Sequence, residues 1–186
     1  MKKDAKKIEG FENFSDVLYV DQTPIIKSPR ANIATYTKIW DEIRTIFSNT
    51  DYAKQNNIGK SSFSFNVDGG RCKECKGMGY LKEDMQFLED VYITCPVCLG
   101  KRFKDKILKV AYKGKNINDI LNMSLENAKE FFKDNEKISN AVFFLEKLGL
   151  SYLTLGESLS ELSGGEAQRL KLVPLYYESK NECVKN

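Results

Sequence analysis

The chain contains no histidine, and this absence limits the chemistry that it can carry out. A Ser-His-Asp triad cannot form within it, and any metal site must be built from thiolates or carboxylates. The sequence also lacks a run of about 18 apolar residues, so we expect no membrane-spanning helix. Its basic start is followed by Glu9, Glu12 and Asp16, where a secretory signal would be apolar, and this favours the cytoplasm.

The residues that are present indicate a folded chain of one or two small domains. Apolar residues make up 41% of its 186 residues and charged residues 30%, enough for a buried core and a solvated surface. The net charge is only +3, but it is distributed unevenly. Between Lys101 and Lys115, seven cations accompany a single carboxylate, that of Asp105.

The spacing of apolar residues predicts helices together with a few short strands. A stripe from Tyr36 to Phe47 would form a buried helix face, and Ser163 and Pro174 would begin and end the last helix. Helices are therefore expected at 35–55, 125–132, 138–148 and 164–173. Short strands are expected at 14–20, 63–67 and 108–112, with a turn at 113–116. Together these elements predict an α+β fold.

Four of the five cysteines have the spacing of a metal site. Cys72 and Cys75 form one C-x-x-C pair, and Cys95 and Cys98 form a second pair after nineteen residues. Two such pairs complete a tetrahedral zinc site with no open position, so the zinc would be structural and not catalytic. Cys183, in the polar tail, is expected to be an ordinary free thiol.

Cations flank both cysteine pairs, and two interpretations of them remain open. Four thiolates around Zn²⁺ carry a local charge of −2, which Lys73, Lys76, Lys101 and Arg102 could offset. The same side chains could instead contact the phosphates of DNA. The two roles are compatible with each other.

The string Leu-Ser-Gly-Gly-Glu-Ala-Gln-Arg at 162–169 is the second strong motif. Ser163 and Glu166 have capping-box spacing, and Gly164 and Gly165 would leave the first amides of the helix uncovered for a phosphate. A serine and a glutamate at this spacing would by themselves indicate only a capped helix. The whole string, however, resembles the signature motif of ABC ATPases. That resemblance implies that Ser163, Gly164, Gly165, Glu166 and Gln168 close over ATP held by another nucleotide-binding domain.

Further motifs, together with the cysteine pairs and the signature string, resemble the UvrA family, the damage-recognition ATPases of bacterial nucleotide excision repair. The resemblance runs from about Lys7 to Val173 and is to the second, C-terminal ABC half. The matching strings lie at 21–25, 28–30, 34–37, 63–67, 69–72, 87–91 and 112–115. The resemblance implies an incomplete ABC-ATPase fold, in which a zinc module is inserted into a helical signature subdomain.

The resemblance also implies a division of the chain into segments. Residues 1–30 would form a strand and a Q-loop-like segment of the ABC core, and 31–62 the first helical part of the signature subdomain. Residues 63–106 would form the zinc module, and 107–173 the rest of the signature subdomain. Residues 174–186 would be a divergent tail.

Several further residues take a role from this resemblance. Gln22 stands where the family has its Q-loop glutamine, near Mg²⁺ and the attacking water. Lys27 and Arg30 stand in a basic, DNA-facing loop, and Arg71, Lys101 and Arg102 are further candidate DNA contacts. The chain departs from the family at several positions, including Lys38, where the family usually has glycine.

The motifs that phosphoryl transfer needs are missing from the sequence. No Walker A loop precedes Lys7, no Walker B strand follows Val173, and the family's switch histidine has no counterpart. We therefore expect no ATPase activity from the chain alone, and ATP and Mg²⁺ to bind only with a partner domain. The implied partners are DNA, the missing ABC segments or a second UvrA-like chain, and a UvrB-like protein.

The implied function is participation in ATP-gated recognition of DNA damage. A second hypothesis is a stand-alone, zinc-stabilised DNA-binding module without ATPase activity, and a third is a decayed remnant. The sequence leaves open whether the chain is a natural short protein, half of a split gene or such a remnant. It also leaves open a repair or a self-protection role, the lesion bound and the oligomeric state.

Overall fold

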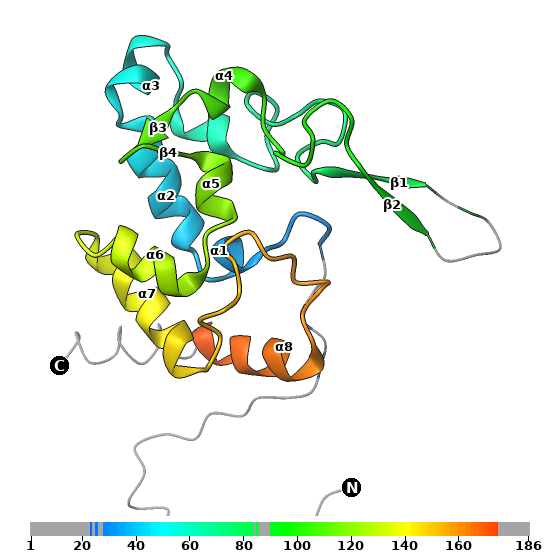
Figure 1. The fold of residues 1–186 in the computed structure, drawn as a ribbon, viewed down its shortest axis with the longest axis vertical. Helices are drawn as coiled ribbons and strands as arrows, with labels where there is room; N and C mark the ends of the chain where they lie inside the picture. Colours follow the sequence, from blue (N-terminus) through cyan, green and yellow to red (C-terminus); the bar gives the residue numbers. More distant parts are fainter. Residues whose placement is uncertain (1–22, 24, 26–27, 84, 86–89, 175–186) are drawn as a thin grey trace, which may run out of the picture.

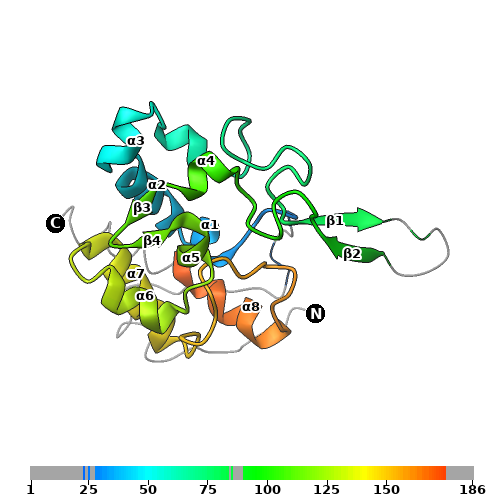
Figure 2. The same cartoon turned by 45° about the horizontal axis from the view of Figure 1, so that its top comes forward.

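A computed structural model of the chain describes residues 23, 25, 28–83, 85 and 90–174 (Figure 1). The candidate residues Gln22 and Lys27 and the strand expected at 14–20 lie outside the described residues. Within the described part, helices form a body from which a two-stranded hairpin projects to one side (Figures 1 and 2). The described fold combines helices with short antiparallel strands, as the sequence predicts.

The helical body surrounds one apolar core. Its first part is built from Ile33–Tyr36 (α1), Ile39–Ser48 (α2) and Asp51–Gln55 (α3). Its second part is built from Ile117–Leu121 (α5), Leu125–Phe131 (α6) and Glu136–Lys147 (α7). Trp40 of α2 anchors this core, because its ring stacks on Phe65 at 4.7 Å and its Nε1 donates to the carbonyl of Phe63. The predicted apolar stripe of α2 is thus confirmed as a core face.

The single helix expected at 35–55 is wrong, because three short helices take its place. Lys38 adopts a left-handed conformation with φ of 61°, which an α-helix cannot continue through. Thr50 then caps α3 by accepting the amide of Ala53, so the chain turns again after α2. Glycine, the usual family residue at Lys38, would adopt this left-handed conformation without steric cost.

The strand expected at 63–67 is also wrong. Lys60–Phe63 forms a short 3₁₀-helix (η2), and the chain beyond it pairs with no neighbouring strand among the described residues. Phe63, Ser64 and Phe65 are all buried, so the apparent alternation does not separate an inner face from an outer one. Packing of Phe65 on Trp40 and of Phe63 on Phe47, and not membership of a sheet, explains the two phenylalanines.

Two small antiparallel hairpins complete the fold. Tyr80–Glu83 (β1) pairs with Val91–Thr94 (β2) in the projecting hairpin, with Tyr80 opposite Thr94. After the short helix Asp105–Leu108 (α4), Ala111–Tyr112 (β3) pairs with Lys115–Asn116 (β4). Their turn at Lys113 and Gly114 has positive φ at both residues, as a two-residue hairpin turn requires. The strand expected at 108–112 is therefore only two residues long, because α4 extends to Leu108.

The last described helix begins at the signature string. Gly164–Leu170 (α8) is capped by Ser163 as predicted, but it ends three residues earlier than expected. Residues 172–174 are helical again, and Pro174 is tolerated there because it lies in the first turn of a helix. Within the described part of the chain, every helix is too short or too polar to cross a membrane.

Candidate functional site

The four predicted metal ligands meet in one buried cluster at the base of the β1–β2 hairpin. The Sγ atoms of Cys72, Cys75, Cys95 and Cys98 all lie within 4.8 Å of one another. Between the two pairs, the Sγ atom of Cys72 lies 4.0 Å from that of Cys95, and the Sγ atom of Cys75 lies 3.6 Å from that of Cys98. A zinc ion with bonds of about 2.3 Å needs sulfurs about 3.8 Å apart in a tetrahedral site. The donors, their spacing and their burial therefore fit a structural zinc ion.

The two cysteine pairs are held by nearly the same backbone conformation. Lys76 and Gly77 follow the first pair with φ of 50° and 85°, and Leu99 and Gly100 follow the second with 50° and 80°. These left-handed residues turn backbone amides back toward sulfur. The N–H of Gly79, for example, lies 3.2 Å from the Sγ of Cys75. Glycine adopts such positive φ angles without steric cost, which suits Gly77 and Gly100 to these turns.

The surroundings of the thiols shift their pKa values in different directions. Burial raises the pKa of Cys75, and it raises that of Cys98 to about 12. Burial also acts to raise the pKa of Cys95, but the backbone amides of Cys98 and Val97 outweigh it and lower the value to about 7. A metal ion must displace the protons of such thiols, so its binding should strengthen as the pH rises.

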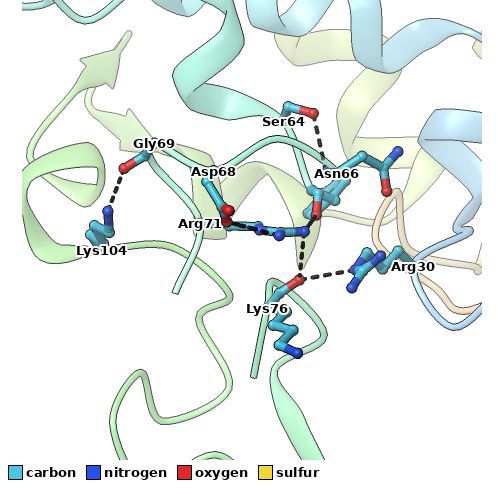
Figure 3. Close-up of polar contacts among 9 residues, drawn as sticks. Arg30, Ser64, Asn66, Asp68, Gly69, Arg71, Lys76 and Lys104 are labelled. Atoms are coloured by element: carbon cyan, nitrogen blue, oxygen red, sulfur yellow. Dashed lines mark hydrogen bonds and ion pairs between the residues drawn. The ribbon is translucent and has the colours of Figure 1, made fainter. Parts of the chain in front are cut away.

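A basic hollow of about 340 Å³ lies beside the first cysteine pair. Figure 3 shows Asp68, Gly69, Arg71, Lys76 and Lys104, which line it. Its cations are those of Arg71, Lys73, Lys76 and Lys104, and Asp68 is its one carboxylate. Lys73 and Lys76 are exposed, and the Nζ of Lys104 donates to the carbonyl of Gly69. The hollow thus combines fixed and exposed cations within one concave surface.

The candidate DNA contacts differ in how much of each side chain is available. Arg71 donates to Asp68 and to the carbonyls of Phe65 and Lys76, and its side chain is only 11% exposed. Arg30 approaches the same Lys76 carbonyl from the other side, at 2.9 Å (Figure 3). These arginines thus tie the chain around the first cysteine pair.

The two candidate cations after the second cysteine pair also differ. Lys101 is exposed. Arg102 is partly buried, and it donates to the carbonyl of Gly156 at 3.3 Å. Arg102 therefore faces the helical body, whereas Lys101 faces solvent.

The signature residues lie at the surface around the start of α8. Ser163, Gly164, Gly165 and Gln168 are exposed, and Glu166 is half-buried. The capping box predicted for Ser163 and Glu166 forms. Ser163 Oγ accepts the Glu166 amide at 3.4 Å, and the Ser163 amide donates to Glu166 Oε2 at 2.6 Å. The start of α8 and the base of the β1–β2 hairpin, where the cysteines cluster, lie at different places on the molecule (Figure 1).

The sequence did not predict two residues that hold this loop. Tyr152 donates to Glu166 Oε1 at 2.5 Å, and this bond, with the bonds to Ser163, lowers the pKa of the Glu166 carboxyl. Arg169 donates to the carbonyls of Leu148 and Gly149 and so ties α8 to the end of α7. No local pattern indicates the partner of Tyr152, which lies fourteen residues away along the chain.

Comparisons with known proteins agree with the motifs. No family model matches the chain. The chain is 51% identical over 167 residues to UvrABC system protein A of Clostridium perfringens, covering 90% of this chain and 18% of that protein. The corresponding protein of Staphylococcus aureus is 51% identical over 166 residues, again covering 18% of that protein. The chain thus spans less than one fifth of the length of these relatives.

A solved structure gives the same result in three dimensions. The crystal structure of UvrA2 from Deinococcus radiodurans superposes with a TM-score of 0.79 at 47% sequence identity. The match covers 83% of this chain and 19% of the other. Sequence and fold therefore each match a portion of a much longer protein.

Proposed function

This chain belongs to the UvrA family, of which it matches one segment, and on that basis we propose that it contributes to ATP-gated recognition of DNA damage. It would supply a zinc module at 63–106 and a signature loop at 163–168. The ABC core segments that complete a nucleotide site would come from elsewhere. Nucleotide and Mg²⁺ would bind only in that complete assembly, where Gln22 would face the metal.

The exposure of Gly164 and Gly165 is the observation that carries this proposal. A Cβ atom at either position would meet nothing within 4 Å, and neither residue has positive φ. Nothing in the described chain therefore requires glycine there, although glycine costs a helix interior up to about 1 kcal/mol relative to alanine. Space at this point is useful only to a group that approaches from outside, such as the γ-phosphate of ATP.

The capping box supports the same function. Ser163 and Glu166 hold each other's backbone amides, so the first turn of α8 is formed before any ligand arrives. Preorganised amides lose little entropy when a phosphate binds, and they can stabilise charge that develops on it during hydrolysis. The loop would thus complete a nucleotide site without holding the nucleotide by itself.

The cysteine cluster supports a structural role for zinc. The cluster is buried, and four thiolates would fill a tetrahedral zinc site and leave no position for a water ligand. Binding at a site of this kind contributes on the order of 10 kcal/mol to folding. The zinc would therefore hold the projecting hairpin and the basic hollow in place, where they could meet DNA and a partner chain.

A chimera tests the proposal most directly. The 167 aligned residues of this chain would replace the matching segment of the Clostridium perfringens relative, and ATP turnover would be measured with and without DNA. We expect the chimera to hydrolyse ATP and the chain alone to be inactive. Metal-dependent hydrolysis by the chain alone, or an inactive chimera that still binds zinc, would contradict the proposal.

The basic hollow beside the cysteines favours a second candidate function, a stand-alone zinc-stabilised DNA-binding module. Lys73, Lys76 and Lys104 surround a concave surface wide enough for a phosphate group. A DNA titration with the chain alone at several salt concentrations distinguishes the two functions. Tight binding that weakens steeply with salt favours the module, and no binding at low salt contradicts it.

A further inference from the structure

Arg102 stands in a backbone conformation that costs an arginine free energy. Its φ is 68°, in the left-handed region that favours glycine. The corresponding residue of the first cysteine pair, seven positions after Cys72 as Arg102 is seven after Cys95, is Gly79 with φ of 87°. The first half of the repeat therefore uses glycine where the second half uses arginine. The arginine side chain must compensate for a strain that glycine would avoid.

The backbone of Arg102 is part of the cysteine cluster. Its carbonyl accepts the amide of Cys72 at 2.8 Å, and its own amide is hydrogen-bonded to the thiol of Cys98. It therefore touches one ligand from each cysteine pair. Any movement of the sulfurs on loss of the metal moves this residue directly.

The side chain of Arg102 extends from the cluster to the helical body. Its guanidinium lies 6.0 Å from the centre of the Phe65 ring and donates to the carbonyl of Gly156. It also lines a hollow of about 160 Å³ together with Glu157 and Glu161. One side chain thus reaches an aromatic core residue and a backbone acceptor, and two carboxylates line the same hollow.

Two glycines make room for this side chain and its acceptor. A Cβ atom at Gly79 would lie 3.2 Å from the Cγ of Arg102 and 2.9 Å from the carbonyl oxygen of Gly100. A Cβ atom at Gly156 would lie 2.9 Å from both the Cβ and the carbonyl oxygen of Leu121. Gly79 therefore makes room for the Arg102 side chain, and Gly156 lets the acceptor segment approach Leu121 closely.

The acceptor segment leads directly to the signature helix. Gly156 is fixed to α5 by its amide, which donates to Leu121 at 2.7 Å. The next residues pair with the start of α1, since the amide of Ile33 donates to Glu157 and that of Leu159 donates to Ala31. Six residues separate Gly156 from Ser163, the cap of α8. Displacement of Gly156 would therefore reach the exposed glycines through a short segment that includes the buried residues Ser158 and Leu159.

We infer that Arg102 is a positioning residue that couples the metal site to the signature loop. Binding of the metal would then make residues 154–166 more ordered. This inference rests on the proposed function, because it assumes both a bound metal and a working loop. By thermodynamic reciprocity, a partner that holds the loop would also tighten metal binding.

Replacement of Arg102 by glycine tests the coupling with little risk of unfolding. Arg102→Gly removes the side chain and relieves the strained φ, so the cysteine cluster should form at least as well as before. The measurement is hydrogen exchange of the zinc-loaded chain, read by mass spectrometry in peptides covering 154–166. We expect exchange there to become roughly tenfold faster, the factor typical of losing one hydrogen bond from a charged donor. Exchange in α6 and α7 should not change.

Two variants serve as comparisons. Arg102→Lys keeps a positive charge and a hydrogen-bonding group. It should therefore show part of the protection from exchange at 154–166 that Arg102→Gly loses. Lys101→Gln alters the exposed neighbour and should leave exchange unchanged. Removing the metal from the original chain should accelerate exchange at 154–166, whereas its removal from Arg102→Gly should add little.

The outcomes separate this inference from the proposed function. Cobalt(II) absorption and metal content report the cysteine site independently of the loop. If the chain binds no metal, the zinc part of the proposed function fails, and the coupling fails with it. If metal is bound and Arg102→Gly leaves exchange at 154–166 unchanged, the coupling alone is overturned.

Discussion

The phenol of Tyr152 donates a 2.5 Å hydrogen bond to Oε1 of Glu166, while the other carboxylate oxygen accepts the amide of Ser163. Both oxygens of one carboxylate are thus used to hold the first turn of α8. Tyr152 itself is 60% exposed, so this hydrogen bond, and not burial, explains its place beside the signature loop.

Substitution of Tyr152 by phenylalanine removes this donor without changing the ring. The bonds from Tyr152 and Ser163 lower the pKa of Glu166. Tyr152→Phe should therefore raise that pKa toward its ordinary value, as measured by NMR titration of the Glu166 side chain. Because the pKa of Glu166 is lower in the folded state than in the unfolded state, its carboxylate stabilises the fold at any pH above the unfolded-state pKa. This contribution is lost as the pH falls through the folded-state pKa. Tyr52→Phe, on α3, is the control and should leave the titration unchanged.

Alanine at Gly165 should affect stability and activity in opposite directions. A Cβ atom there meets nothing within the chain, so Gly165→Ala should leave the folding of the isolated chain unchanged or stabilise it by up to about 1 kcal/mol. In the chimera, the same methyl group would stand in the way of the incoming phosphate. We expect about a 100-fold loss of ATP turnover, the magnitude typical of displacing a reacting group by about 1 Å.

Thermal unfolding and single-turnover kinetics of the same variant check the Gly165 prediction. Ala167→Gly, on the same helix, is the matched control. It should destabilise the helix by about 1 kcal/mol but leave turnover largely intact. Equal turnover by Gly165→Ala and the unmodified chimera would mean that no phosphate approaches these glycines.

The sequence predicts features that depend on local spacing more reliably than features that depend on distant partners. The spacing alone predicts the cluster of Cys72, Cys75, Cys95 and Cys98, because each pair needs only its own turn to present two sulfurs. The capping box of Ser163 was identified for the same reason. In both cases the geometry follows from a few consecutive residues.

The sequence misleads where a distant contact or an unusual dihedral angle decides the structure. Phe63 and Phe65 alternate as a strand would, but Trp40, more than twenty residues away, fixes their conformation. The break at Lys38 depends on a left-handed φ that a lysine does not indicate. The bond from Tyr152 to Glu166 is likewise a tertiary contact without a sequence pattern.

Loss of one cysteine should unfold only part of the molecule. Cys75→Ser removes a fully buried ligand, so residues between Gly69 and Lys106 should lose protection from proteolysis and hydrogen exchange. The helices α6 and α7 pack on each other and should stay protected. Cys183→Ser, which changes the fifth cysteine, is the control and should behave as the original chain does.

Substitutions of the cations around the basic hollow should fall into two groups, those that weaken only DNA binding and those that also lower stability. Lys73→Gln removes an exposed charge, so it should weaken DNA binding and reduce the salt slope by about 1 without loss of stability. Arg71→Gln breaks contacts to Asp68, Phe65 and Lys76, so it should lower the melting temperature as well. Fluorescence anisotropy with a DNA duplex and thermal unfolding distinguish the two variants. An unchanged salt slope for Lys73→Gln would remove this hollow from the DNA surface.

The metal content of the intact chain tests the central claim most directly. Protein purified under reducing conditions, without added chelator, would be weighed by native mass spectrometry and its metal measured by plasma emission. The four buried sulfurs predict one zinc ion per chain, which is released when the sample is acidified and the thiolates take up protons. A folded chain that carries no zinc, and takes none up when zinc is supplied, would contradict the account.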